Sequence, residues 1–207
     1  RIRLIRSSKN IQGLVSYSNE VFKTKFLSYV VLRADELIVG AFIGMYELGI
    51  YSLMVKIFRI IEESIMVPFY NVMLATFSKV KKVSAEGIQI LFSATNLLSC
   101  ITIPWFIALG FFGDDIVSHI LGQSWSRGSA AFVFLALYMS FRTFNYLFSA
   151  YMISNGFARY VSYSTMIYLA MTFLILLPMA KFGIIGVAAG IFSRTFLYFY
   201  HEYVMCE

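Results

Sequence analysis

The stretch YVVLRADELIVGAFIGMYELGIYS, residues 29–52, sets three ionisable side chains inside an apolar run. These side chains are Arg33, Asp35 and Glu36. A charge inside hydrocarbon costs at least ~2.5–3.5 kcal/mol on insertion scales, so a charge that stays there normally faces a partner or a watery cavity. The stretch therefore predicts a membrane helix with a polar inner face.

Glycines follow these charges at intervals that favour close helix packing and a tight turn. Gly40 and Gly44 have the spacing of small residues that lets a neighbouring helix approach closely. Gly49 can end a helix or turn the chain. We therefore predict a helical hairpin here, and the pair Gly186 and Gly190 repeats the packing spacing near the end of the chain.

The composition of the whole chain is that of a membrane protein. Of its 207 residues, 59% are hydrophobic and only 14% are charged, and the mean hydropathy is +0.75. Soluble domains carry about 25% charged residues, and a bilayer core of ~30 Å needs helices of about 20 apolar residues. We predict an all-α, polytopic membrane protein built as a bundle of six transmembrane helices. The predicted spans cover about residues 15–42, 50–77, 88–112, 130–154, 160–180 and 184–205.

Local residues predict some details of these spans. Pro68 should kink the second span. Lys56, Arg59 and Glu63 should share one helix face, with Arg59 and Glu63 placed to pair. Residues 113–128 should form the longest polar connection.

Basic residues lie mainly on one side of the predicted spans. Four precede the first span and three lie in residues 78–86, with Arg159 on the same side. The opposite side has only Arg127 and Lys181. Because Lys and Arg are enriched in cytoplasmic loops, both chain ends are predicted to be cytoplasmic.

The chain divides into a short basic segment and a hydrophobic remainder. Residues 1–14 are interpreted as a cytoplasmic basic linker, and residues 15–207 as a six-helix transmembrane lobe. The sequence begins with Arg1, and no signal peptide is visible. We expect the chain to be a fragment of a longer protein.

Several functional classes find no support in the sequence. The net charge of +6 is not gathered on one amphipathic face with interleaved aromatic residues, so we predict no nucleic-acid partner. Cys100 and Cys206 lack metal-ligand spacing, and His119 and His201 are far apart. HExxH, GxSxG and Walker A motifs do not occur. We therefore predict a protein that is not an enzyme and that has no cofactor or metal.

The candidate site consists of cations within the predicted spans. They are Arg33, Lys56, Arg59, Arg142 and Arg194. The acidic residues opposed to them are Asp35, Glu36, Glu62 and Glu63. Separate structural ion pairs would explain some of these charges. If the cations instead converge on one cavity, the cavity suits an anionic substrate, since Arg binds phosphate bidentately.

With these residues laid out, the sequence resembles a known family of transporters. The pattern Asp35-x-Leu-Ile-Val-Gly40-x-Phe-Ile-Gly44-x3-Leu48-Gly49-Ile-Tyr51-Ser52 is similar to the signature that opens the second six-helix lobe of Wzx-type O-antigen and exopolysaccharide flippases. These form the polysaccharide transporter branch of the multidrug/oligosaccharidyl-lipid/polysaccharide flippase superfamily. Weaker matches in the family's order are Phe77-Ser78-Lys79, Gly122-Gln-Ser-Trp125, Asn155-Gly156 and Gly183-Ile-Ile-Gly186-Val-Ala188.

The resemblance implies translocation of a polyprenyl-pyrophosphate-linked oligosaccharide across the bacterial cytoplasmic membrane by alternating access. In this reading the five cations bind the substrate, and Asp35, Glu36 and Glu63 serve as cavity acids or coupling groups. Coupling to Na⁺ or H⁺ is left open. The implied partners are the lipid-linked oligosaccharide, the bilayer, a missing amino-terminal lobe of the same chain and glycan polymerase machinery.

Three other readings are kept. A multidrug or metabolite exporter on the same scaffold would favour acidic cavity residues for cationic cargo. A membrane-embedded glycan polymerase or ligase would be expected to concentrate Arg and His in a large outer loop, and residues 113–128 look too short for one. A structural membrane subunit would have no need of so many charges at mid-membrane depth.

Overall fold

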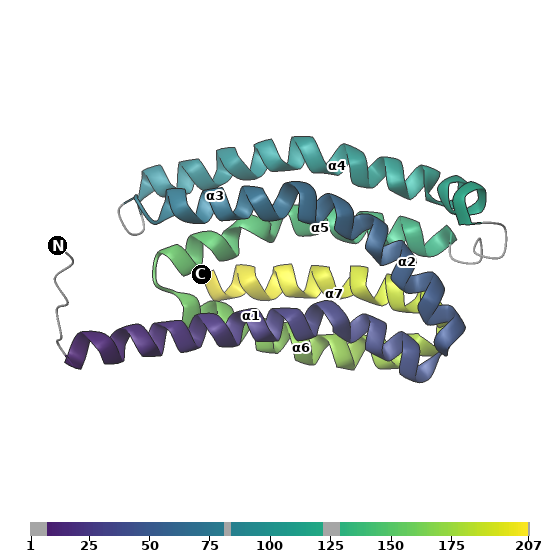
Figure 1. Cartoon of the computed structure of the whole chain (residues 1–207), viewed down its shortest axis with the longest axis horizontal. Helices are drawn as coiled ribbons and strands as arrows, with labels where there is room; N and C mark the ends of the chain where they lie inside the picture. Colours follow the sequence, from purple (N-terminus) through teal and green to yellow (C-terminus); the bar gives the residue numbers. More distant parts are fainter. Residues whose placement is uncertain (1–7, 81–83, 122–128, 207) are drawn as a thin grey trace.

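The computed structural model describes residues 8–80, 84–121 and 129–206, and all of its regular elements are helical (Figure 1). In chain order they are α1 (Ser8–Phe42), α2 (Met45–Ile61), the π-helical turn η1 (Glu62–Met66), α3 (Val67–Phe77), α4 (Ala85–Leu121), α5 (Ser129–Ser154), α6 (Ala158–Met179), the 3₁₀ turn η3 (Ala180–Phe182) and α7 (Gly183–Cys206). The prediction of an all-α protein is confirmed for the described residues.

Three helical stretches in the described part of the chain are long and apolar enough to cross a membrane. They are Ala85–Gly113, Ala130–Ser154 and Ala158–Tyr198. The third contains both α6 and α7. α1 does not belong to this group, because Arg33, Asp35 and Glu36 interrupt its apolar half.

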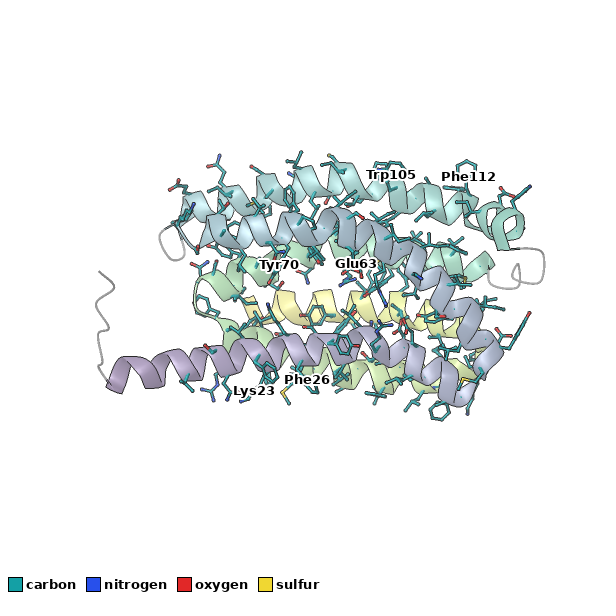
Figure 2. All side chains as sticks on the ribbon, in the orientation of Figure 1. Lys23, Phe26, Glu63, Tyr70, Trp105 and Phe112 are labelled. Carbon is teal, nitrogen blue, oxygen red and sulfur yellow. The ribbon has the colours of Figure 1, made fainter. Side chains whose placement is uncertain are left out.

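The outer faces of the helices carry large apolar side chains. On α4, Trp105 is 59% exposed and Phe112 is 60% exposed, and Figure 2 shows both projecting away from the other helices. Single exposed apolar residues are common in soluble proteins, but a long apolar helix with exposed aromatic residues on its outer face fits contact with lipid.

The turn between α1 and α2 is shorter than the sequence indicated. Within this turn, Gly44 has a positive φ of 134° with ψ of 166°, a conformation that favours glycine. α2 begins at the next residue, Met45. Gly49, predicted to turn the chain, lies inside α2. Gly40 serves close packing, because a Cβ at this position would lie 3.0 Å from the Leu48 side chain. Tight packing of Gly40 on Leu48 positions α1 against α2.

Gly44→Ala is expected to lower the free energy of unfolding by about 1–3 kcal/mol, because its backbone angles are accessible essentially to glycine alone. Thermal unfolding of the purified protein in detergent measures the change. Gly49→Ala is the control and should alter stability by less than about 1 kcal/mol, because Gly49 has a helical backbone. Equal melting temperatures for the two variants would contradict the assignment of the turn to Gly44.

The helix that follows this turn is divided by the π-helical turn η1, which lies directly before Pro68. Proline has no N–H group, and its ring would clash with the carbonyl four residues earlier, so the hydrogen-bond register changes here. The extra residue in the turn rotates the following side chains. Glu62, the first residue of η1, lies four residues after Phe58 on the same buried helix face, while Glu63 is exposed, and the predicted Arg59–Glu63 pair is not formed.

α4 is longer than predicted. The expected span ended at residue 112, but the helix continues to Leu121, so His119 lies in its last turn and not in a loop. Gly113 packs against α5, because a Cβ there would lie 2.6 Å from the Phe132 ring. This packing outweighs the weak helix propensity of glycine and aspartate, which costs only about 1 kcal/mol per residue. Residues 122–128, with the predicted Gly122–Trp125 match, lie outside the described part.

The remaining turns occur at the glycines where the sequence indicated them. α5 ends at Ser154, and Gly156 follows with φ of 91°. Gly183 has φ of 71° and reverses the chain, so that α7 packs back against α6 (Figure 1). The side chains of His201 and Glu202, at the end of α7, lie outside the described part of the structure.

The helices form two groups that meet at one end of the bundle. α3, α4 and α5 pack on one another, and α1, α6 and α7 form the other group (Figure 1). The groups share a buried core around Ile38, Tyr51, Phe58, Leu135 and Val187, near the α1–α2 turn. Towards the opposite end the two groups separate around a cavity.

Candidate functional site

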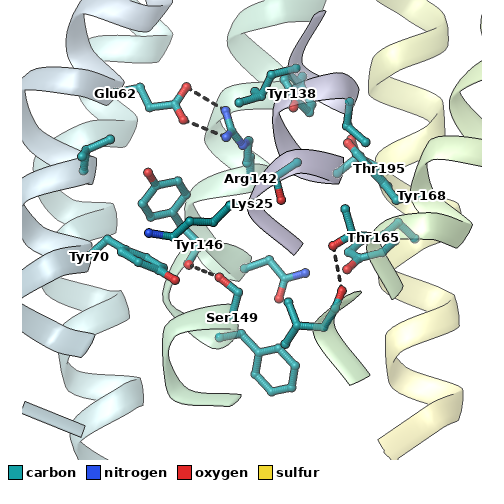
Figure 3. Close-up of a pocket in the computed structure, with 18 of the residues that line it drawn as sticks. Lys25, Glu62, Tyr70, Tyr138, Arg142, Tyr146, Ser149, Thr165, Tyr168 and Thr195 are labelled. Atoms are coloured by element: carbon teal, nitrogen blue, oxygen red, sulfur yellow. Dashed lines mark hydrogen bonds and ion pairs between the residues drawn. The ribbon is translucent and has the colours of Figure 1, made fainter. Parts of the chain in front are cut away.

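A cavity of about 480 Å³ lies between the two helix groups. Helices α1, α3, α5, α6 and α7 supply its walls, together with Glu62 of η1 (Figure 3). Its lining lies towards the bundle end that carries the α3–α4 and α5–α6 connections, which are the basic connections of the sequence.

Six of the twenty residues that line the cavity are tyrosines. Two edge-to-face pairs stand on different walls. Tyr70 of α3 contacts Tyr146 of α5 with ring centroids 5.7 Å apart, and Tyr168 of α6 contacts Tyr198 of α7 at 4.7 Å. Further polar lining residues are Ser28, Asn71, Asn145, Ser149, Thr165 and Thr195. Tyrosine offers an apolar ring face and a hydroxyl, and such a lining can contact both the faces and the hydroxyl groups of a sugar.

An ion pair forms one wall of this cavity. The Nη1 and Nη2 groups of Arg142 donate to Oε2 and Oε1 of Glu62 at 2.8 and 2.7 Å (Figure 3). The Arg142 side chain is 21% exposed and the Glu62 side chain 9% exposed. The guanidinium also lies 5.6 Å from the centre of the Tyr146 ring. Arg142 is thus a cation with both terminal nitrogens occupied, at the edge of an open space.

Lys25 of α1 is a second cation on the cavity lining. Figure 3 shows its side chain extending towards Tyr70 and Tyr146. It is exposed, and it forms no salt bridge with any carboxylate in the described residues. An anion entering the cavity would therefore meet Lys25 without having to replace a protein carboxylate.

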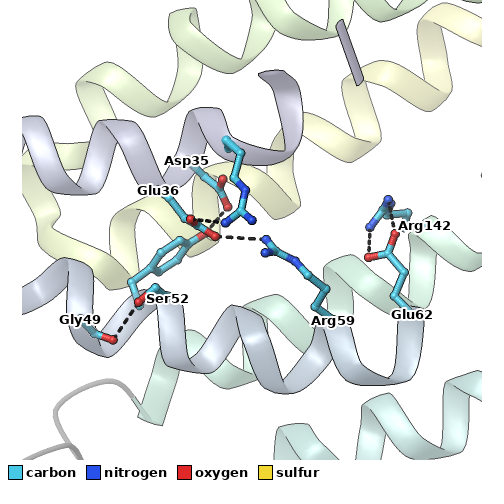
Figure 4. A network of polar contacts seen from close by, with 9 residues as sticks. Asp35, Glu36, Gly49, Ser52, Arg59, Glu62 and Arg142 are labelled. Atoms are coloured by element: carbon cyan, nitrogen blue, oxygen red, sulfur yellow. Dashed lines mark hydrogen bonds and ion pairs between the residues drawn. The ribbon is translucent and has the colours of Figure 1, made fainter. Parts of the chain in front are cut away.

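A second polar network joins α1 to α2 (Figure 4). Glu36 accepts from Arg33 at 2.7 Å and from Arg59 at 3.1 Å. Beside it, the Tyr51 hydroxyl donates to Asp35 Oδ2 at 2.6 Å. These contacts place Arg33, Asp35 and Glu36 each beside a hydrogen-bonding partner, which lowers the cost of burying them.

The two networks border a common small space. A cavity of about 30 Å³ is lined by Asp35, Arg59, Glu62 and Arg142, together with apolar residues and Tyr138. Arg59 and Glu62 come from adjoining segments of the same helix and reach towards different neighbours, Glu36 of α1 and Arg142 of α5 (Figure 4).

Arg194 of α7 is buried in an aromatic setting. It is only 3% exposed, and its guanidinium lies 4.1 Å from the centre of the Tyr168 ring. It donates to the Thr172 hydroxyl, and Asp35 attracts it electrostatically. Its role in the structure is to join α7 to α6.

The structure does not bring the five predicted cations together in one cavity. Of these residues, Arg142 lines the larger cavity, while Arg59 lines the smaller one only. Arg33 and Arg194 lie on neither lining, and Lys56 is exposed on α2. The expected convergence fails because Arg33 pairs with Glu36 of its own helix, while partners on neighbouring helices hold Arg59 and Arg194.

The predicted acidic residues are also distributed differently. Asp35 lines the smaller cavity, Glu36 bridges two arginines and Glu63 is exposed. Glu62 and not Glu63 is the buried, paired acid of this segment, because Glu62 lies on the face of the helix that meets Arg142 of α5. Gly186 and Gly190 lie at the packed end, where a Cβ on Gly190 would lie 3.3 Å from the Met179 side chain.

Sequence reasoning missed the tyrosine walls and the part played by Lys25. A signal was present, because Tyr138 and Tyr146 occur eight residues apart on α5, and Tyr160 and Tyr168 have the same spacing on α6. Residues eight apart are turned by about 80° around a helix, so both can belong to one broad helix face. In the described ranges, no group of three His, Cys, Asp or Glu side chains could hold a metal ion.

Comparison with known proteins gives one match. A family model described as "Polysaccharide biosynthesis protein" matches residues 1–130. This range includes α1 to α4 with Glu36, Arg59 and Glu62, and it ends before Arg142. No curated protein and no solved structure matches the chain.

Proposed function

Because the chain belongs to the polysaccharide biosynthesis protein family, we propose that it moves a polyprenyl-diphosphate-linked oligosaccharide across a bacterial cytoplasmic membrane. The cargo is an O-antigen or exopolysaccharide repeat unit. The chain acts as one lobe of a two-lobe transporter that works by alternating access. It catalyses no covalent reaction and needs no cofactor.

The cavity carries this proposal. Its volume of about 480 Å³ lies within the ~300–1,000 Å³ that ligand pockets commonly have. It combines two cations, Lys25 and Arg142, with walls of tyrosine and small polar residues. This combination fits a ligand that has an anionic group next to a sugar. A lipid tail attached to that group can remain in the bilayer, outside the helix bundle.

In this proposal all six long helices cross the membrane. The helices α1, α4, α5, α6 and α7 have 35, 37, 26, 22 and 24 residues, and about 20 residues span the hydrocarbon core. The sixth crossing is α2, η1 and α3 taken together. Pairing of Arg33 with Glu36 and of Arg142 with Glu62 lowers the desolvation cost of placing these charges in the membrane, because each cation keeps a hydrogen-bonded partner.

Orientation follows from the basic connections. The cavity lies towards the end with Lys79 and Arg159, where α1 begins and α7 ends, so we place this end on the cytoplasmic side. A substrate assembled in the cytoplasmic leaflet then enters directly. A second lobe, glycan polymerase machinery and coupling to Na⁺ or H⁺ would complete the cycle.

Transport by the complete protein in liposomes tests the proposal. The probe is a polyprenyl-diphosphate-linked oligosaccharide with a labelled sugar, and the readout is the label that becomes accessible on the opposite leaflet. We expect transport by the wild type. Transport of fluorescent cations in place of the glycolipid would favour a multidrug exporter, and elongation of the glycan would favour a polymerase.

Lys25→Gln is expected to slow this transport at least about tenfold, because a hydrogen bond to a charged group contributes about 1.5–3 kcal/mol. Lys23→Gln is the matched control. Lys23 lies two residues earlier on α1 and does not line the cavity, so its variant should transport at the wild-type rate. Equal rates for both variants would contradict a role of Lys25 in the cavity.

A further inference from the structure

Arg142 has a distinct position among the charged residues. Of the cations that the structure describes, it alone lines both the larger and the smaller cavity. Both of its terminal nitrogens already donate to Glu62. An anion that enters the larger cavity can therefore bind the Nη1–Nη2 edge of Arg142 bidentately only if the Glu62 carboxylate leaves it.

We propose that Glu62 is a displaceable internal anion, which a phosphate or diphosphate group replaces on Arg142. Displaced Glu62 turns into the smaller cavity towards Arg59. This inference rests on the proposed function, since it describes how the same cavity accepts an anionic group. Because Glu62 competes with the anion for Arg142, Glu62 sets how tightly the cavity binds that anion.

The chemistry of the pair permits the exchange. Carboxylate and phosphate oxygens bind the planar guanidinium in the same bidentate geometry, so one can replace the other without moving Arg142. In the empty cavity Glu62 is needed, because an uncompensated buried charge is strongly destabilising. A diphosphate carries more charge than a carboxylate and can contact Lys25 as well, which Glu62 does not pair with.

The structure also provides a place for the displaced carboxylate. Glu62 and Arg59 both line the smaller cavity of about 30 Å³, which is the volume of one water molecule. Arg59 makes one hydrogen bond to Glu36, at 3.1 Å, and a guanidinium has five N–H donors. Glu62 opens the π-helical turn η1, a type of irregularity that is frequent at functional sites.

The exchange would connect the cavity to α1. When Glu62 pairs with Arg142 it joins η1 to α5, and when it pairs with Arg59 it adds a negative charge beside the Arg59–Glu36 contact between α2 and α1. The empty cavity therefore has an ion pair between η1 and α5, and the loaded cavity has this ion pair replaced by an added charge at the contact between α2 and α1. A two-state contact of this kind is what coupling between ligand and helix arrangement requires.

Binding of inorganic pyrophosphate to the complete protein in nanodiscs tests the proposal by calorimetry. Glu62→Gln is expected to bind at least about tenfold more tightly than wild type, because the competing carboxylate is gone. Glu63→Gln is the matched control, since Glu63 is adjacent but exposed, and should bind as wild type does. Arg142→Gln should lose binding. If Glu62→Gln is poorly folded, Glu62→Asp keeps the charge with a shorter reach and should bind with intermediate affinity.

A double-mutant cycle separates the exchange from a merely structural role of Glu62. Arg59→Gln should weaken pyrophosphate binding in the wild type, because it removes the second partner of the displaced carboxylate. In the Glu62→Gln background the same change should have no effect on the affinity. Equal effects in both backgrounds would overturn the exchange between Arg142 and Arg59.

The two possible failures are distinguishable. Unchanged affinity in Glu62→Gln with lost binding in Arg142→Gln would overturn the exchange and leave the anion site of the proposed function intact. Undiminished binding in Arg142→Gln would overturn both. A lipid source of the anion is identified if polyprenyl diphosphate in the nanodisc competes with pyrophosphate, and a soluble source if a nucleoside diphosphate sugar does so more strongly.

Discussion

Export of surface glycan is expected to fall at least about thirtyfold when Arg142 is replaced by glutamine in the complete protein, since losing one partner of a buried, hydrogen-bonded charge pair costs about 2–5 kcal/mol of binding free energy. The change removes the cation that both cavities share and leaves the Glu62 carboxylate facing the larger cavity, where it repels an anionic group. The measurement is the amount of glycan on cells that carry the variant in place of the wild-type gene.

Controls separate this loss from a loss of folded protein. Arg159→Gln changes an exposed arginine that does not line the cavity, and it should leave export unchanged. The double variant Arg142→Gln/Glu62→Gln removes both charges and should restore the amount of protein in the membrane without restoring export. Near-normal export by Arg142→Gln, at a wild-type protein level, would contradict a function of the cavity in anion binding.

Gly186→Ala is expected to prevent stable folding, with a loss in the free energy of unfolding above the ~1–3 kcal/mol typical of overpacking. A Cβ at Gly186 would overlap the backbone carbonyl oxygen of Met179 and lie 2.6 Å from the Cβ of Phe182. Both neighbours belong to the tight reversal between α6 and α7, so neither can yield as the tip of a flexible side chain would. Thermal unfolding and the fraction of monodisperse protein in detergent measure the effect.

Gly190→Ala provides the comparison for this prediction. Its added Cβ would lie 3.3 Å from Cγ of Met179, a side chain that can shift by the few tenths of an ångström required. Its melting temperature should therefore stay within a few degrees of the wild type, a shift that corresponds to about 1 kcal/mol. If Gly186→Ala has the same melting temperature as Gly190→Ala, the inference that Gly186 is closely packed in this reversal is contradicted.

The sequence was sufficient for those features that depend on local pattern. Composition and apolar run length predicted a helical membrane protein, and Gly156 and Gly183 marked real reversals, because few other residues adopt positive φ. The resemblance noted over Asp35–Ser52 is confirmed at the level of family by the match over residues 1–130.

Features that depend on contacts between helices could not be read from local pattern. The choice between Glu62 and Glu63 as the paired acid depends on which face of the helix meets Arg142 of α5, and the spacing of the charged residues alone does not give that face. The length of α4 depends on the contact of Gly113 with Phe132 on another helix. Pairing of Arg59 with Glu36 likewise requires the relative rotation of two helices, which sequence spacing does not give.

The length of α4 has a consequence for the membrane around it. Its apolar portion, Ala85–Gly113, has 29 residues, and at ~1.5 Å per residue it reaches about 43 Å. This matches the thickness of a bilayer with its headgroups, about 40–45 Å, rather than the hydrocarbon core alone. In the proposed membrane-spanning arrangement, the final turns of α4, with Asp115 and His119, would stand at the interface, and the lipid next to this helix would thicken or the helix would tilt.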